Sequence, residues 1–117
     1  MKKLLLSLFL ITISLPAWAG DAKESAFDRV MRTGVIRCGY YMFPPATYRD
    51  PNTNQLSGFT VDMMEEIAKR AGLKIDWTEE INFSNWIPAL QSNRFDVSCT
   101  PNWPDTPQGR AAAFSIP

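Results

Sequence analysis

The segment 58–72 lies between two glycines and has the pattern of an amphipathic helix, and this pattern limits most strongly what the chain can fold into. Its apolar residues recur at three- and four-residue spacing: Val61, Met64, Ile67, Ala68 and Ala71. At that spacing they form one stripe along a helix. The charged residues fall on or near the other side: Glu65, Glu66, Lys69 and Arg70. A helix with a single apolar stripe is suited to lie on a sheet.

The ends of this helix are also marked in the sequence. Thr60 or Asp62 is expected to accept hydrogen bonds from the free amides of the first turn. Gly72 is expected to end the helix in the left-handed conformation. Residues 73–77 then alternate apolar and polar side chains, which predicts a strand. A helix that leads through one glycine into a strand is half of a β-α-β unit.

Residues 1–19 have the features of a cleaved secretory signal peptide. Lys2 and Lys3 form a basic start, residues 4–15 are mostly apolar, and Ala17-Trp18-Ala19 is a small-x-small cleavage site. A membrane anchor is the alternative, but about 12 apolar residues are too few to span a bilayer. The mature chain is therefore expected to be exported and soluble, and periplasmic where the host has two membranes.

The composition argues against several classes of function. Without Lys2 and Lys3 of the signal peptide, the formal charge of the chain falls from 0 to −2, and positive and negative residues are interspersed. Nothing in this charge pattern indicates a nucleic-acid-binding surface. The sequence has no histidine, the commonest general base and metal ligand. It also has no glycine-rich phosphate loop and no nucleophile elbow. We expect a protein that is not an enzyme and needs no cofactor or metal.

The remaining segments predict alternating strands and helices. Residues 20–34 form an N-terminal segment with a short helix, which Ser25 caps and Gly34 ends. The other predicted elements are strands at 35–41, 73–78 and 95–100, a hairpin at 48–57, a helix from Ser84 or Asn85 to Asn93, and a helical turn at 110–114. The order β-α-β-α-β predicts an α/β fold with a parallel, doubly wound sheet. We expect residues 35–117 to be a truncated lobe, because no further element completes the last unit.

Two cysteines, Cys38 and Cys99, fall on predicted strands of an exported chain. If the two strands are neighbours, a disulfide is geometrically possible, because adjacent strands lie about 5 Å apart. Alternatively, both residues are small buried hydrophobes on inner strands. Both alternatives stay open at the level of the sequence.

In an open parallel sheet, ligands bind outside the carboxyl ends of the strands. This rule selects the loops 40–47, 79–84 and 100–110, which carry Tyr40, Tyr41, Phe43, Phe83, Thr100, Asn102, Trp103 and Arg110. An arginine can bind a carboxylate bidentately, a hydroxyl can add a bond, and an aromatic face can cover an apolar group or an ammonium. Each residue also has a structural alternative: Phe43 and Phe83 would cover the sheet end, Trp103 would pack under the prolines, and Arg110 would pair with Asp105.

Several motifs, in this order and spacing, resemble the N-terminal part of the family 3 extracellular solute-binding proteins. They are Gly34-Val-Ile-Arg-Cys-Gly39, the Pro45 loop, Gly58-Phe-Thr-Val-Asp62, Ala68-Lys-Arg-Ala-Gly72, Trp86-Ile-Pro-Ala-Leu90, Phe95-Asp-Val97, and Arg110 with Phe114-Ser115. The resemblance covers residues 35–117. It implies a three-layer lobe of a type II periplasmic binding protein, hinged to a second lobe, which closes around its ligand and then docks on the membrane subunits of an ABC permease.

The resemblance also implies roles for three residues. Phe83 falls where the family stacks an aromatic ring on the ligand, Thr100 lies in a hydroxyl-bearing run, and Arg110 lies near the arginine that binds the α-carboxylate. The sequence departs from the family at several positions: Ala46, Tyr40 or Tyr41, Pro101, Trp103, and an Arg110 two residues nearer to Phe114 than usual. These departures leave a bulkier or non-amino-acid ligand open beside a standard α-amino acid.

The resulting hypothesis is a periplasmic, monomeric, non-enzymatic protein that delivers an amino acid or related small polar solute, such as a small carboxylate, to an ABC-type permease. Three alternatives use the same fold. One is the sensor lobe of a signalling protein, the second is the accessory lobe of a cell-wall lytic enzyme, and the third is a periplasmic dehydratase.

Overall fold

The computed structural model describes residues 23–115, so the predicted signal peptide lies outside the described residues. The described chain is built on a three-stranded sheet in the order β4-β1-β5. Its strands are β1 (Val35–Tyr40), β4 (Lys74–Glu80) and β5 (Val97–Ser98). β1 pairs in parallel with both neighbours, which confirms the predicted parallel sheet. β5 is shorter than predicted, because only Cys38 and Gly39 of β1 pair with it.

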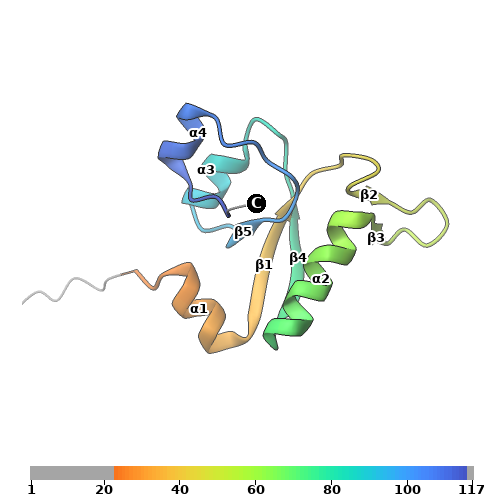
Figure 1. Ribbon diagram of the computed structural model, residues 1–117, viewed down its shortest axis with the longest axis horizontal. Helices are drawn as coiled ribbons and strands as arrows, with labels where there is room; N and C mark the ends of the chain where they lie inside the picture. Colours follow the sequence, from red (N-terminus) through yellow and green to blue (C-terminus); the bar gives the residue numbers. More distant parts are fainter. Residues whose placement is uncertain (1–22, 116–117) are drawn as a thin grey trace, which may run out of the picture.

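The helices lie on both sides of this sheet, as the β-α-β-α-β order predicts. They are α1 (Ala26–Thr33), α2 (Phe59–Ala71), α3 (Trp86–Gln91) and α4 (Thr106–Ala111). α2 lies on one side, and α1 and α3 lie on the other (Figure 1). The predicted hairpin at 48–57 is confirmed as an antiparallel pair of short strands, β2 (Tyr48–Arg49) and β3 (Leu56–Ser57).

α2 ends as predicted but begins differently. Gly72 has the left-handed φ of 69° and its N–H closes the helix on the carbonyls of the last turn. At the other end, the expectation that Thr60 or Asp62 caps the helix is wrong. The N-cap is Gly58, which has φ 122° and makes no side-chain bond. Glycine is required there, because a Cβ would lie 2.3 Å from the carbonyl oxygen of Ala46.

The apolar stripe of α2 is only partly covered. Val61 and Ala68 are buried, whereas Ile67 is 49% exposed; Met63, which lies beside the stripe, is 50% exposed. This part of α2 lines a cavity along the edge of β5, whose pairing partner within residues 23–115 is β1 alone. The sequence pattern therefore identified a face that the described residues do not fully bury.

The other helices follow their sequence signals, with one shift. Ser25 caps α1 by accepting from the Asp28 N–H, and Gly34 ends the helix with φ 72°. Asn93 takes the predicted left-handed φ, here 57°. The helical turn expected at 110–114 lies instead at 106–111, because the Asp105 side chain accepts from the Gln108 N–H and starts the helix earlier.

The main hydrophobic cluster lies between α3 and the sheet. It consists of Tyr41, Ile81, Trp86, Ala89 and Phe95. Phe95 is 1% exposed, and its ring lies so close to the backbone of β1 that a Cβ on Gly39 would be 2.5 Å from it. This close approach seats the segment before β5 directly against the central strand.

Asp96 joins three elements just before β5 begins. Its side chain is 2% exposed and accepts from the Arg37 backbone N–H at 2.8 Å, from Arg37 Nη2 at 3.0 Å and from Arg29 Nε at 3.0 Å. Arg29 comes from α1 and Arg37 from β1. A buried carboxylate between two arginines and a backbone amide therefore holds α1 and the start of β5 on the central strand.

The structure joins Cys38 and Cys99 by a disulfide, which decides between the two sequence alternatives. Their Cα atoms are 5.5 Å apart and both residues are buried. The bridge therefore links β1 to the residue that follows β5.

The bridge should be detectable by thiol chemistry and by stability. In denaturant without reductant, we expect no reactive thiol, and after reduction two; two free thiols before reduction would contradict the bridge. Because the bond closes a loop with a sequence separation of 61, the double variant C38A/C99A is expected to lower the free energy of unfolding by about 4 kcal/mol on a chain-entropy argument. Urea denaturation measures this loss.

Asp96→Asn should destabilise the fold, because it leaves two partly buried arginines without their counter-charge. We expect a loss of about 3 kcal/mol in the free energy of unfolding, measured by urea denaturation. Asp62→Asn is the matched control: Asp62 is exposed, and within residues 23–115 its side chain forms no hydrogen bond or ion pair. The control should change stability by less than about 0.5 kcal/mol; an equal effect of both variants would rule out the Asp96 cluster as a special interaction.

Candidate functional site

The three loops that the sequence selected meet at one end of the sheet. Figure 1 shows the loops after β1, β4 and β5 at the same end of the strands. Four aromatic rings from these loops form a continuous chain of edge-to-face contacts. Tyr41 contacts Phe83 at 5.6 Å between ring centroids and Phe43 at 6.3 Å, and Phe43 contacts Trp103 at 6.2 Å. We call Tyr41, Phe43, Phe83 and Trp103 the aromatic rim.

Three of the four rim residues keep large exposed faces. Phe43 is 44% exposed, Phe83 53% and Trp103 61%. Trp103 is therefore not packed under the proline-rich loop, which was its structural alternative. Exposed aromatic faces gathered from three loops offer a surface that can cover an apolar group or an ammonium.

Tyr41 is the buried anchor of the rim. Its backbone N–H donates to Thr100 Oγ1 at 3.1 Å, and its hydroxyl donates to the Pro101 carbonyl oxygen. Burial raises the pKa of the Tyr41 phenol. The first strand's exit loop is thus fastened to the last strand's exit loop through Tyr41, and Thr100 is fixed beside the rim.

Tyr40 does not join the rim. Successive residues of a strand point to opposite faces, and the Tyr40 ring packs against Trp77 at 5.9 Å, while its hydroxyl accepts from Arg49 Nη2 at 3.2 Å. Of the two adjacent tyrosines, only Tyr41 has the geometry expected of a site residue.

Arg110 is also separate from the rim. It lies on α4 and is exposed, and across residues 23–115 its side chain forms no hydrogen bond or ion pair. The alternative pairing with Asp105 is wrong, since Asp105 caps α4 instead. The carboxylate-binding role of Arg110 remains a prediction.

The acidic residues at this end of β4 are already paired. Arg49 Nη2 lies 3.7 Å from Glu80 Oε2, and Arg94 forms an ion pair with Glu79. The rim therefore offers a ligand aromatic faces rather than an unpaired carboxylate of β4. Thr100 beside it is only 4% exposed, and its hydroxyl oxygen already accepts from the Tyr41 N–H.

Asn102 holds the turn after β5 by hydrogen bonds that could not be predicted from the sequence. Its Nδ2 donates to Ser98 Oγ and to the Thr100 carbonyl oxygen, both at 2.8 Å, which shapes the turn after β5. Its Oδ1 is buried without a hydrogen-bond partner in the described structure. An asparagine just after a strand is a signal for such a turn, but its partners depend on the tertiary structure.

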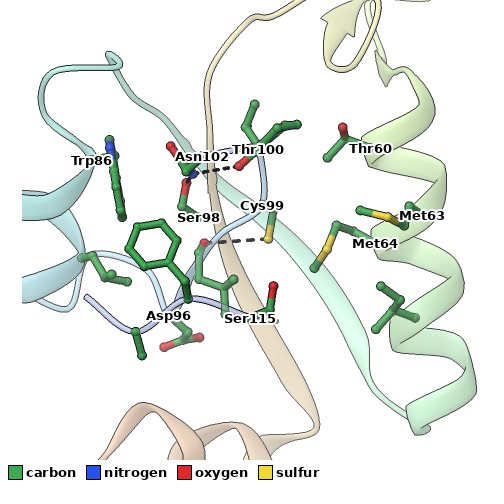
Figure 2. A pocket seen from close by; sticks show the side chains of 16 residues that line it. Thr60, Met63, Met64, Trp86, Asp96, Ser98, Cys99, Thr100, Asn102 and Ser115 are labelled. Carbon is green, nitrogen blue, oxygen red and sulfur yellow. Dashed lines mark hydrogen bonds between the residues drawn. The ribbon is translucent and has the colours of Figure 1, made fainter. Parts of the chain in front are cut away.

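A cavity of about 780 Å³ lies elsewhere, along the outer edge of β5. Figure 2 shows Met63 and Met64 of α2 on one side of it, Trp86 of α3 on the other, and Ser98 and Cys99 between them. Of the residues that the sequence selected on the exit loops, Thr100 and Asn102 line it, and the disulfide residue Cys99 lines it as well. An open strand edge with apolar flanks is typical of a surface on which more protein packs, so we place the candidate ligand site at the rim.

Two features are absent from residues 23–115. Among residues 23–115, no group of three or more cysteine, aspartate or glutamate side chains is placed to hold a metal ion. No helix in this range has both the length and the apolar character needed to cross a membrane.

Comparison with known proteins identifies a family. Bacterial extracellular solute-binding proteins, family 3, match residues 36–117. The L-cystine-binding protein TcyA of Bacillus subtilis is 36% identical over 110 residues, which cover 83% of this chain and 40% of that protein. Cyclohexadienyl dehydratase of Pseudomonas aeruginosa is 30% identical over 98 residues, which cover 83% of this chain and 36% of the enzyme. The chain thus spans less than half the length of these relatives.

A solved structure supports the fold. Domain 1 of TmArgBP, in its arginine-bound form, superposes with a TM-score of 0.68 at 29% identity. The match covers 77% of this chain and 71% of that domain. The three-layer lobe predicted from the sequence is therefore the lobe of a type II periplasmic binding protein.

The Tyr41 phenol should make stability depend on alkaline pH. A group whose pKa is raised by folding stabilises the protein below its unfolded pKa, about 10 for tyrosine, and this contribution is lost as the pH rises through the folded pKa. At neutral pH, Tyr41→Phe should lower the free energy of unfolding by about 1 kcal/mol, because the Pro101 carbonyl loses its hydrogen-bond donor. The gap in unfolding free energy between protein and variant should then narrow above about pH 10.

Urea denaturation at a series of pH values measures this gap. Tyr48→Phe is the control, because Tyr48 is exposed and its hydroxyl has no hydrogen-bond partner in residues 23–115. A gap for Tyr41→Phe that stays constant across the alkaline range would show that the burial of Tyr41 does not influence its ionisation.

Proposed function

Because the chain belongs to the family 3 bacterial extracellular solute-binding proteins, we propose that it forms part of the first lobe of a periplasmic protein that delivers an amino acid or a related small polar solute to an ABC-type permease. The observation that carries the proposal is the aromatic rim, in which rings from three exit loops meet at the carboxyl end of a parallel sheet.

The aromatic rim, Thr100 beside it and Arg110, which lies apart from the rim on α4, each have a role in this proposal. The exposed faces of Phe43, Phe83 and Trp103 cover the apolar part of the ligand or its ammonium group. The Thr100 hydroxyl accepts from the Tyr41 N–H, so its own O–H is the group that would donate a hydrogen bond to the ligand. Arg110 binds the carboxylate, for which its fork of N–H donors is suited; in the structure it is exposed and so is available to a ligand.

Lobe closure explains why three aromatic side chains are left exposed. The rim is one wall of a cleft, and a second lobe, from the part of the relatives that this chain does not cover, would form the other wall. Closure would then bury the aromatic faces together with the ligand, and the apolar area removed from water stabilises the closed state. The closed, monomeric protein would dock on the membrane subunits of the permease.

The periplasmic location rests on residues 1–19, which have the pattern of a secretory signal, and on the family, whose members are extracellular.

A second candidate function is that of a dehydratase, and the similarity to cyclohexadienyl dehydratase favours it. The two functions differ in what happens to the bound molecule. A binding protein returns its ligand unchanged, whereas a dehydratase releases it without a water molecule. We favour binding without chemistry, because the L-cystine-binding protein is 36% identical to this chain, whereas the dehydratase is 30% identical.

A thermal-shift screen of amino acids and small carboxylates on the full-length protein tests the proposal. A ligand that binds only the native state at 100 times its Kd stabilises that state by about 2.7 kcal/mol, which raises the melting temperature. Any ligand found is then incubated with the protein and recovered for mass spectrometry. If the ligand is recovered unchanged, the binding function is supported. If it is recovered without a water molecule, the dehydratase function is supported. If no compound raises the melting temperature, both functions are contradicted.

Phe83→Ala and Arg110→Ala should each weaken binding of that ligand by more than tenfold, or about 1.4 kcal/mol, with the fold intact. Calorimetry measures the affinity and circular dichroism checks the fold. The matched controls are Phe27→Ala on α1 and Arg70→Ala on α2, both exposed and remote from the exit loops. Unchanged affinity in either test variant removes that residue from the proposed site.

A further inference from the structure

The short strand β5 is held in the sheet by few backbone contacts. Its ladder with β1 consists of two residue pairs, Cys38 with Val97 and Gly39 with Ser98. Two backbone hydrogen bonds flank the ladder: Asp96 N–H to the Arg37 carbonyl and Cys99 N–H to the Gly39 carbonyl, each 2.8 Å. Within residues 23–115, the other edge of β5 has no partner. A ladder this short gives the following loop little support of its own.

The pairing of β1 with β4 is irregular at Cys38 and Gly39, the same two residues that pair with β5. Cys38 lies opposite Trp77, but Gly39 lies opposite Glu79, so the register with β4 shifts between these two residues of β1. Beyond this shift the pairing with β4 resumes through Gly39 with Glu79 and Tyr40 with Glu80, so the end of β1 is held on the β4 side, while on the β5 side it has only the short ladder. The two exit loops that carry most of the aromatic rim begin directly after this level.

The disulfide lies at the place where the ladder ends. Cys38 is on β1, two residues before Tyr40, and Cys99 is the residue that joins β5 to its exit loop. Both cysteines are buried, at 0% and 3% exposure. A covalent bond here fixes the distance between the two chain segments where hydrogen bonds alone are sparse.

The residues just beyond the disulfide connect it to the rim. Thr100 follows Cys99 and accepts from the Tyr41 N–H, and the Tyr41 hydroxyl donates to Pro101. Tyr41 in turn contacts the rings of Phe43 and Phe83. The bridge, the Thr100 hydroxyl and the Tyr41 ring thus form one connected path from the sheet to the ligand-facing surface.

We propose that the Cys38–Cys99 disulfide is a positioning element of the ligand site, which holds the exit loop of β5 against the exit loop of β1 in the geometry that the ligand needs. This inference rests on the proposed function and adds to it a role for the two cysteines. Neither cysteine touches the ligand. The bond acts by keeping Thr100 and Tyr41 in place, so that the rim is formed before the ligand arrives and binding does not have to order it.

The test separates positioning from general stability. The full-length double variant C38A/C99A is compared with Ile75→Ala, which truncates a half-buried side chain at the other end of β4 and lowers stability far from the rim. Both variants are studied at low temperature, where circular dichroism shows them to be folded. Calorimetry then measures the affinity for whichever amino acid or carboxylate raises the melting temperature of the unaltered protein.

We expect the double variant to bind that compound at least tenfold more weakly than the unaltered protein, while Ile75→Ala binds within about twofold of it. Equal affinities in all three proteins would overturn the positioning role. Equal losses in both variants would also overturn it, because the effect would then follow stability alone.

Hydrogen exchange supplies a readout that needs no ligand, so the inference can fail or stand independently of the proposed function. The Tyr41 amide, which donates to Thr100, should exchange at least tenfold faster in C38A/C99A than in Ile75→Ala at the same temperature. If the Tyr41 amide is equally protected in both variants, the disulfide does not position the two loops, whatever the protein binds.

Discussion

The parallel pairing of β1 with a neighbour on each side is the constraint on which the rest of the structure depends. It makes three successive strands finish at the same edge, so the loops that leave them have to meet. The helices, the Asp96 ion cluster and the disulfide all act on this arrangement by keeping α1 and β5 against the central strand. The aromatic rim is a consequence of that geometry, since its rings come from segments that are distant in the sequence.

Much of the architecture could be predicted from local signals. The stripe of α2 and the left-handed residues Gly34, Gly72 and Asn93 are properties of short segments, and the structure has them where the sequence placed them. The meeting of Tyr41, Phe83 and Trp103 also followed from the sequence, because it needs only the order and direction of the strands. The open alternatives for the cysteines were resolved only by their distance in three dimensions.

The errors arose where a side chain's environment depends on distant segments. Thr60 has the chemistry of a cap, but the exit loop of β1 brings Ala46 against the helix start, and Gly58 is the N-cap instead. Tyr40 and Tyr41 are identical in type, and only the alternation of the strand together with Trp77 and Arg49 decides that Tyr40 turns away. Asp96 joins α1 to the sheet through two arginines. It belongs to the motif Phe95-Asp-Val97, and nothing in that motif indicates which residues the aspartate pairs with.

The contact between Gly39 and Phe95 limits how this chain can vary over evolution. The phenyl ring occupies the space that any larger residue at position 39 would need. Neither position is free to drift alone: a side chain gained on the central strand would demand a smaller residue before β5, and the paired change would also move the start of that strand. Among relatives that keep the fold, the two sites are therefore expected to covary as a pair.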